Sequence, residues 1–226
     1  MAKHQTYLDE FEGRIIFFDT ETTGFNATGI DNRDKIVEIG CVEVEDGKRQ
    51  DTYHVYINPE REIPDDAIAI HGITDDQVQD ERKFYQVAEE FLSFVNGATV
   101  VAHNAEFDVS FINAELEEAG RRLNKPLGKI EDYCTVVDSL KQARRLMPGR
   151  KNDLDSLAKR FKVDTSSRDL HGALVDSVIL ADVYGAIIKY ERENDIKVVE
   201  KPYQDVVEVK EIKLNKRPRK STSLSL

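Results

Sequence analysis

The most constraining feature of this sequence is an apolar run that ends in two acidic residues. Ile-Ile-Phe-Phe at positions 15–18 predicts a short buried β-strand over 14–19. Asp19 and Glu21 stand two residues apart at its end, so their side chains point to the same side of the strand. In open α/β sheets the carboxyl ends of the strands form the usual ligand site. The pair therefore marks a candidate site, although two solvated acids at a plain strand end are the alternative.

Strand patterns come first in the chain and then alternate with helical patterns. Segments rich in β-branched residues predict strands at 36–44, 53–57, 99–102 and 133–137, the first two joined as a hairpin. Apolar residues at helical spacing predict helices at 83–95, 107–119, 138–147, 152–161 and 174–190. We expect Gly120 to end the second of these helices. This order indicates an α/β domain whose mixed sheet carries helices on both faces.

The charge balance restricts how this chain can bind a polyanion. Its 43 acidic and 32 basic residues give a net charge of -11, which excludes capture of nucleic acid by a broadly basic surface. Such binding must be local or assisted by bound cations. Cys41 and Cys134 provide neither a disulfide framework nor a zinc site, as is typical of a reducing compartment. No apolar run approaches the ~20 residues of a membrane span, and residues 1–13 are polar, so we expect a cytoplasmic protein without membrane contact.

Two further acidic residues stand on apolar faces of predicted helices. Asp108 has Phe111 and Ile112 at i+3 and i+4, and Asp176 repeats the pattern in the last helix. A carboxylate on an apolar stripe is costly unless it is paired or bound to a metal. Each alone could be a helix cap or a half-exposed acid, but two such acids and the strand pair together predict a cluster.

Carboxylates gathered in one pocket repel one another, so they either bind protons or surround cations. Hard oxygen ligands favour Mg²⁺ or Mn²⁺ over zinc. Two such ions ~3.5 to 4 Å apart can clamp the attacking and leaving oxygens of a phosphodiester. His171 stands five residues before Asp176, so it faces the same site only from the loop before the helix, where it can take a proton from water. A helix-entry histidine bonded to backbone is the alternative.

Three segments, in this order and spacing, resemble the DEDDh 3'-to-5' exonucleases, most closely the proofreading (epsilon) subunits of bacterial DNA polymerase III. They are Asp19-Thr20-Glu21-Thr22-Thr23-Gly24, His103-Asn104-Ala105-Glu106-Phe107-Asp108 and His171-Gly172-Ala173-Leu174-Val175-Asp176. The resemblance covers roughly residues 15–190. It implies a ribonuclease-H-like fold, two divalent cations (Mg²⁺ or Mn²⁺) and release of nucleoside monophosphates from a DNA 3' end.

Matching positions imply roles for individual residues. The resemblance makes His171 the general base and assigns the metals to Asp19, Glu21, Asp108 and Asp176, of which Asp19, Glu21 and Asp176 also contact the substrate. Asp66 and His71 fall where the family contacts the terminal nucleotide. Alternatively, Asp66 caps the turn after Pro64 and His71 shapes a loop. We expect His103 to be architectural, with local partners in Asn104 and its own backbone.

The chain divides by pattern into a catalytic domain at 1–192 and a flexible tail at 193–226, where charges mix with isolated apolar residues. Residues 219–226 resemble a short peptide that binds the sliding clamp, with Leu224 and Leu226 filling a pocket, although Ser221 stands where a glutamine is expected. The implied partners are a single-stranded or frayed DNA 3' end, the catalytic alpha subunit of the polymerase and the clamp. A stand-alone DNA or RNA exonuclease of the same fold and a non-catalytic replisome scaffold are the alternatives.

Overall fold

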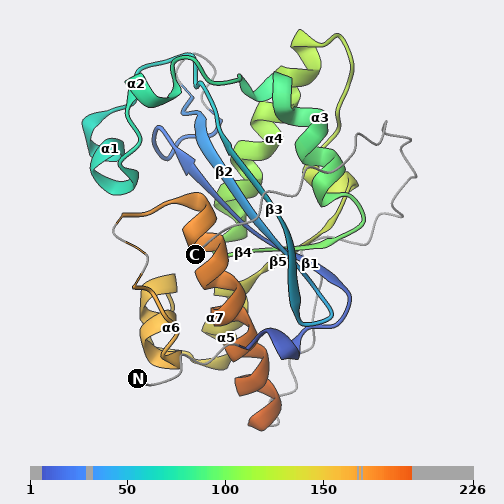
Figure 1. Ribbon diagram of the computed structural model, residues 1–226, viewed down its shortest axis with the longest axis vertical. Coiled ribbons are helices and arrows are strands. Elements are labelled where there is room, and N and C mark those ends of the chain that lie inside the picture. Colours follow the sequence, from blue (N-terminus) through green and yellow to red (C-terminus); the bar gives the residue numbers. More distant parts are fainter. Residues whose placement is uncertain (1–6, 29–32, 167, 169, 195–226) are drawn as a thin grey trace.

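A mixed sheet with the strand order β3-β2-β1-β4-β5 divides the helices into two layers (Figure 1). The computed structural model describes residues 7–28, 33–166, 168 and 170–194. The strands are β1 (Arg14–Thr22), β2 (Ile36–Glu45), β3 (Lys48–Tyr56), β4 (Thr99–Ala102) and β5 (Thr135–Asp138). β2 pairs antiparallel with β1 and β3, whereas β4 pairs parallel with β1 and β5. This is the expected mixed α/β sheet.

The helices cover both faces of the sheet. They are α1 (Asp65–His71), α2 (Asp75–Val78), α3 (Phe84–Val95), α4 (Ala105–Arg122), α5 (Ser139–Leu146), α6 (Leu154–Phe161) and α7 (Ala173–Glu193), with 3-10 turns at Leu8–Glu10 and Ile130–Asp132. Helices α3 and α4 pack on one face, and α7 crosses the other face against β1 and β2. None of the described helices is both long and apolar enough to cross a membrane.

Alternation along β1 decides which side of the sheet carries the acids. Phe18 is buried in the cluster under α3 and α4, whereas Phe17 lies on the opposite side, with its ring 6.0 Å from that of Tyr184 in α7. Asp19 and Glu21 continue the Phe17 side because side chains two apart share a face. Both acids therefore point toward the side of the sheet that α7 covers.

The first turn of α7 rests directly on β2. A Cβ atom added to Gly40 would lie 2.2 Å from the backbone of Ala173 and Leu174, so only glycine permits this approach. Ser177 of α7 donates a buried hydrogen bond of 2.9 Å to the carbonyl oxygen of Gly40. This contact fixes where the helix begins relative to the strands.

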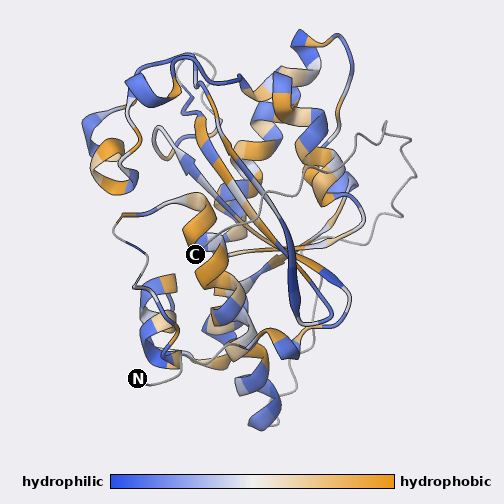
Figure 2. Cartoon of the chain, in the orientation of Figure 1, coloured by the Kyte–Doolittle hydropathy of each residue, from blue (hydrophilic) through white to orange (hydrophobic). Residues whose placement is uncertain are grey.

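The predicted strands and long helices are present, with shifted ends. The prediction that Gly120 ends a helix is wrong: α4 runs to Arg122, and the chain turns at Asn124, whose φ is 50°. Helix α7 continues beyond the predicted end at 190 to Glu193. Its last turns are hydrophilic, as Figure 2 shows, so the sequence has no apolar period there from which to predict them. The segment after Pro64 contains α1 and α2, which have seven and four residues and are too short to show such a period.

Candidate active site

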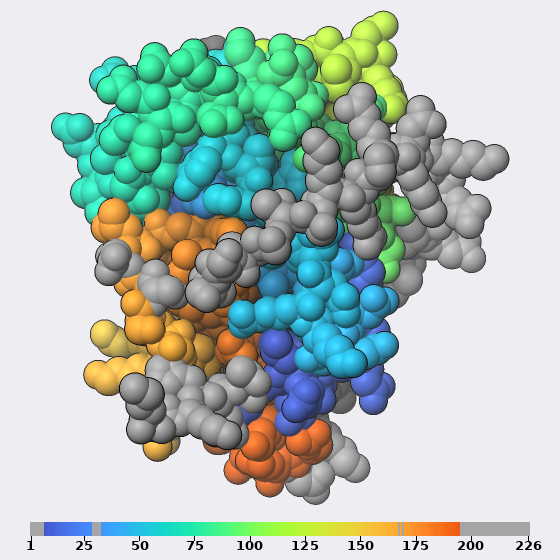
Figure 3. Space-filling view, in the orientation of Figure 1, coloured from blue at the N-terminus to red at the C-terminus, as the bar shows by residue number. Residues whose placement is uncertain are grey.

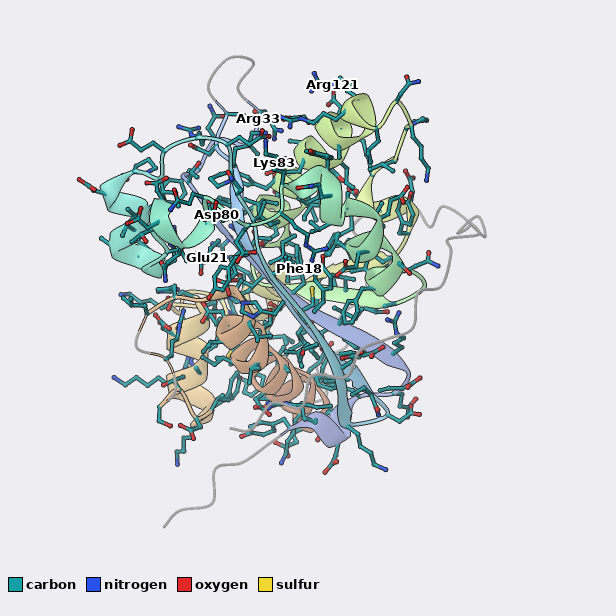
Figure 4. All side chains as sticks on the ribbon, turned by 45° about the horizontal axis from the view of Figure 1, so that its top comes forward. Phe18, Glu21, Arg33, Asp80, Lys83 and Arg121 are labelled. Carbon is teal, nitrogen blue, oxygen red and sulfur yellow. The ribbon has the colours of Figure 1, made fainter. Side chains whose placement is uncertain are left out.

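The acidic end of β1 lies where three parts of the chain meet. In Figure 4 the labelled Glu21 lies between α1 and the beginning of α7. The space-filling view shows the α1–α2 segment and the first part of α7 as neighbours on one face of the molecule (Figure 3). Glu21 itself is 8% exposed. A ligand at this end of the sheet can therefore contact β1, α1 and α7 together.

Asp108 joins this end of the sheet from α4. It is buried, and its Oδ1 accepts hydrogen bonds from the backbone nitrogen of Thr20 at 3.1 Å and from the Thr20 hydroxyl at 2.7 Å. Burial raises the pKa of Asp108 to about 7, although the bonds from Thr20 act in the opposite direction. The acid on the apolar stripe is thus paired, and the pairing brings the start of α4 to the acids of β1.

His171 and Asp176 approach the same point from the start of α7. His171 lies in the loop before the helix, as predicted, because Gly172 is the N-cap. Its Nδ1 is 3.2 Å from Oδ2 of Asp176, and its backbone nitrogen donates to the carbonyl oxygen of Ile70 in α1 at 3.2 Å. The backbone-bonded alternative is therefore also present, while the ring still faces Asp176. Burial is the main cause that raises the pKa of Asp176.

Arg168 is a member of this group that sequence reasoning did not single out. Its Nη2 lies 2.7 Å from Oδ2 of Asp176 and 2.6 Å from Nδ1 of His171, and its Nη1 pairs with Asp155. In the sequence it is one of nine basic residues between positions 141 and 168. Its place three residues before His171 was the available signal.

The donor set fits divalent cations. One ligand atom each of Glu21, His171 and Asp176 lie within 4.8 Å of one another. Oδ1 of Asp176 is buried and has no hydrogen-bond partner among the described residues, although a buried carboxylate oxygen needs one. A cation would satisfy that oxygen, and oxygen-rich sites suit hard ions.

The charges of these acids act on one another, which places Asp19 in the same cluster. Burial raises the pKa of Asp19 well above its usual range, and the charges of Asp108, Glu21 and Asp176 raise it further. Burial and the charge of Asp176 likewise raise the pKa of Glu21 to about 8. The structure thus brings together the four acids and the histidine from distant parts of the chain.

The predicted nucleotide contacts lie on α1 in different settings. Asp66 is exposed, and its Oδ1 accepts from the backbone nitrogen of Ala67 at 3.0 Å, which favours the local, turn-capping alternative. His71 is buried, and its Nδ1 accepts from the backbone nitrogen of Ile73 at 3.0 Å. Burial lowers the pKa of His71, while the nearby Thr22 carbonyl acts in the opposite direction. His71 therefore lies beside the end of β1.

His103 is architectural, but the expectation of local partners is wrong. Its Nδ1 lies 2.9 Å from the hydroxyl of Ser139 and its Nε2 lies 2.9 Å from the carbonyl oxygen of Asn152. Burial lowers the pKa of His103. The ring ties the end of β4 to α5 and to the loop before α6. Leu224, Leu226 and the rest of the predicted tail from position 195 lie outside the described residues.

Comparison with known proteins gives one family. The family model described as Exonuclease, of the RNase T type, matches residues 16–184. DNA polymerase III subunit epsilon of Haemophilus influenzae is 46% identical over 173 residues, which are 76% of this chain and 66% of that protein. The protein of the same name from Buchnera aphidicola (subsp. Baizongia pistaciae) is 42% identical over 185 residues, 81% of this chain and 74% of that protein.

Solved structures agree with this result. Exonuclease X in complex with 5' overhanging duplex DNA is 30% identical, with a TM-score of 0.57, over 81% of this chain and 93% of that chain. The nuclease domain of 3'hExo, a DEDDh family member bound to rAMP, is 18% identical, with a TM-score of 0.65, over 80% of this chain and 94% of that chain. The second likeness supports the ribonuclease-H-like fold expected from the sequence.

Proposed function

This chain belongs to the exonuclease family, as a 3'-to-5' exonuclease of the DNA polymerase III epsilon type, and from that premise we propose how its residues act. Asp19, Glu21, Asp108 and Asp176 hold two divalent cations, Mg²⁺ or Mn²⁺, and His171 is the general base. The observation that carries this proposal is the approach of Glu21, His171 and Asp176 to within 4.8 Å, beside an unpartnered buried oxygen of Asp176.

The side chains divide the work of hydrolysis. When bound, the cations supply Lewis-acid polarisation of the phosphodiester and neutralise its charge. His171, whose Nδ1 lies 3.2 Å from Oδ2 of Asp176, takes a proton from the attacking water as the general base. The water oxygen then bonds to the phosphorus, the bond to the 3' oxygen of the preceding nucleotide breaks, that oxygen takes a proton from solvent to become the new 3' hydroxyl, and a nucleoside monophosphate leaves. Asp19, Glu21 and Asp176 also face the substrate phosphate in this proposal.

The substrate is a single-stranded or frayed DNA 3' end. Reaching a paired end costs a few kcal/mol of unpairing and unstacking, so mismatched ends enter more readily and the site discriminates without reading bases. Asp66 and His71 on α1 contact the terminal nucleotide in this proposal. The buried place of His71 beside the end of β1 supports its assignment more than the exposed place of Asp66 does.

The partners in this proposal are those of a replicative proofreader. The 42–46% identity to proteins named DNA polymerase III subunit epsilon supports association with that polymerase through its catalytic alpha subunit. Clamp binding through Leu224 and Leu226 is proposed from the peptide resemblance. The 30% sequence identity to Exonuclease X supports a stand-alone exonuclease as the second candidate function. Co-purification of this chain with the alpha subunit separates the two.

Trimming of a 5'-labelled single-stranded oligonucleotide in the presence of Mg²⁺ tests the proposal. We expect wild type to shorten the labelled oligonucleotide one nucleotide at a time, and we expect Asp176→Asn to lose that activity. Asp182→Asn is the matched control, because Asp182 is a second largely buried carboxylate of α7 but pairs with Arg49, away from the site. An inactive wild type, or a fully active Asp176→Asn, contradicts the proposal.

A further inference from the structure

A fifth acid, Glu38, lies beside the site and is unexplained by the metal assignment. It is the cross-strand partner of Glu21 in the β1–β2 pair and is 3% exposed. Like charges directly opposite each other in a sheet are destabilising, and Glu38 also contributes to the raised pKa of Glu21. A buried acid at this position therefore needs compensating contacts.

Both carboxylate oxygens of Glu38 are engaged by protein groups. Oε1 lies 2.7 Å from Nε2 of His54 on β3, and Oε2 accepts a hydrogen bond of 3.0 Å from the backbone nitrogen of Ala173. Ala173 is the first residue of α7. Because both oxygens have partners, Glu38 differs from Asp176, whose Oδ1 has none in the described part of the chain.

The bond to Ala173 replaces the cap that α7 lacks. The N-cap residue is Gly172, which has no side chain to accept from the first helical amides. An anion at this end of a helix is also favoured by the helix dipole. Glu38 thus caps α7 from the neighbouring strand, two residues along from Gly40, on which the same helical turn rests.

The capped turn carries the reacting groups. His171 lies two residues before Ala173, and Asp176 lies three residues after it. Movement of this turn along the sheet changes the separation of both side chains from Glu21. We propose that Glu38 is a positioning residue, which holds the first turn of α7 so that His171 and Asp176 face Glu21. This inference rests on the proposed function for the meaning of that geometry.

Two substitutions separate the hydrogen bond from the charge. Glu38→Ala removes the acceptor for Ala173, whereas Glu38→Gln keeps an amide oxygen for it and an amide NH₂ that donates to the other tautomer of His54. Glu43→Ala is the matched control: Glu43 is an equally buried glutamate of β2, but it pairs with Arg14 on the opposite side of the sheet.

The first measurement is kcat and KM on single-stranded DNA with Mg²⁺. We expect Glu38→Ala to lower kcat ~10- to 100-fold, as for other residues that orient metal-site groups, and to change KM less than ~3-fold. Glu38→Gln restores kcat to within ~3-fold of wild type, and Glu43→Ala retains the kcat of folded wild type. Equal losses in Glu38→Ala and Glu43→Ala, or in the Ala and Gln variants of Glu38, overturn the proposal.

The second measurement is hydrogen exchange of the Ala173 amide by NMR, with EDTA present to remove metal ions. A separate sample without EDTA is titrated with Mn²⁺ to count the bound ions. We expect faster exchange in Glu38→Ala, protection as in wild type for Glu38→Gln, and an unchanged number of bound Mn²⁺ ions in both. Unchanged exchange in Glu38→Ala, or loss of a bound ion, overturns the proposal. Wild type that fails to degrade DNA defeats the proposed function instead, while the exchange result still reports whether Glu38 holds α7.

Discussion

Neutralising Glu21 is expected to stabilise the protein while abolishing its activity. Burial and then the charges of Asp176 and Glu38 raise the pKa of Glu21 from 4.5 to about 8. Between these two pH values the folded chain holds a proton that the unfolded chain has lost, so stability falls as pH rises through this window. The full penalty is present above pH ~8 and absent below pH ~4.5.

The size of the effect follows from the shift. A rise of roughly 3.5 pKa units at 1.36 kcal/mol each corresponds to about 5 kcal/mol above pH 8. This is an upper limit, because Asp19 and Asp108 relieve part of the same repulsion when they bind protons. We therefore expect Glu21→Gln to raise the free energy of unfolding by on the order of 2 kcal/mol or more at pH 8.5, and by much less at pH 5.

Urea unfolding in EDTA at the two pH values measures this difference. In a second unfolding series, with Mg²⁺ in place of EDTA, the ion should stabilise wild type more than Glu21→Gln, since only wild type keeps the full set of ligands. Glu43→Gln is the control, because Glu43 pairs with Arg14 and its neutralisation should not stabilise the fold. If Glu21→Gln is no more stable than wild type at pH 8.5, the reasoning from the burial and mutual repulsion of these carboxylates is refuted.

Three further changes test the supporting structure. Gly40→Ala should lower the free energy of unfolding by about 1–3 kcal/mol or more, because its Cβ would lie 2.2 Å from the backbone of α7; an unchanged Tm contradicts the close contact. Thr20→Val should cost about 1–3 kcal/mol by urea unfolding at pH 8, since Asp108 loses a buried donor; a neutral result shows that the bond is dispensable. Burial lowers the pKa of His103, so the stability of the fold should decrease as pH drops below about 6.5. His103→Gln should lose less stability at low pH than wild type, as measured by Tm values over a pH series. An unchanged slope of Tm against pH would assign the low-pH loss of stability to other groups.

The fold was predictable because burial left clear periods in the sequence. The apolar run at 15–18 and the later alternation of strands and helices fixed the mixed sheet. Helices α1 and α2 were not predicted, because seven and four residues do not complete a recognisable amphipathic pattern. Gly120 predicted a helix end, but α4 continues past it to Arg122. A glycine in a helix interior costs only about 1 kcal/mol, which the packing of α4 on the sheet can offset.

The candidate site was predictable where an acid broke an apolar pattern. Asp108 and Asp176 were conspicuous for that reason, and the structure brings both to the end of β1. Arg168 was not conspicuous, because its partners are acids that only the folded chain places beside it. Glu38 left a weak signal as an acid within an apolar strand, but its bond to Ala173 spans 135 residues and is set by tertiary structure alone.

The most direct test of the central claim is the anomalous scattering of crystals grown with Mn²⁺ and a nucleoside monophosphate. We expect two Mn²⁺ peaks about 4 Å apart at the end of β1, held by oxygens of Asp19, Glu21, Asp108 and Asp176, with His171 outside the ligand shell. Crystals that bind the nucleotide but show no anomalous peak among these carboxylates contradict the claim that they converge in order to hold cations.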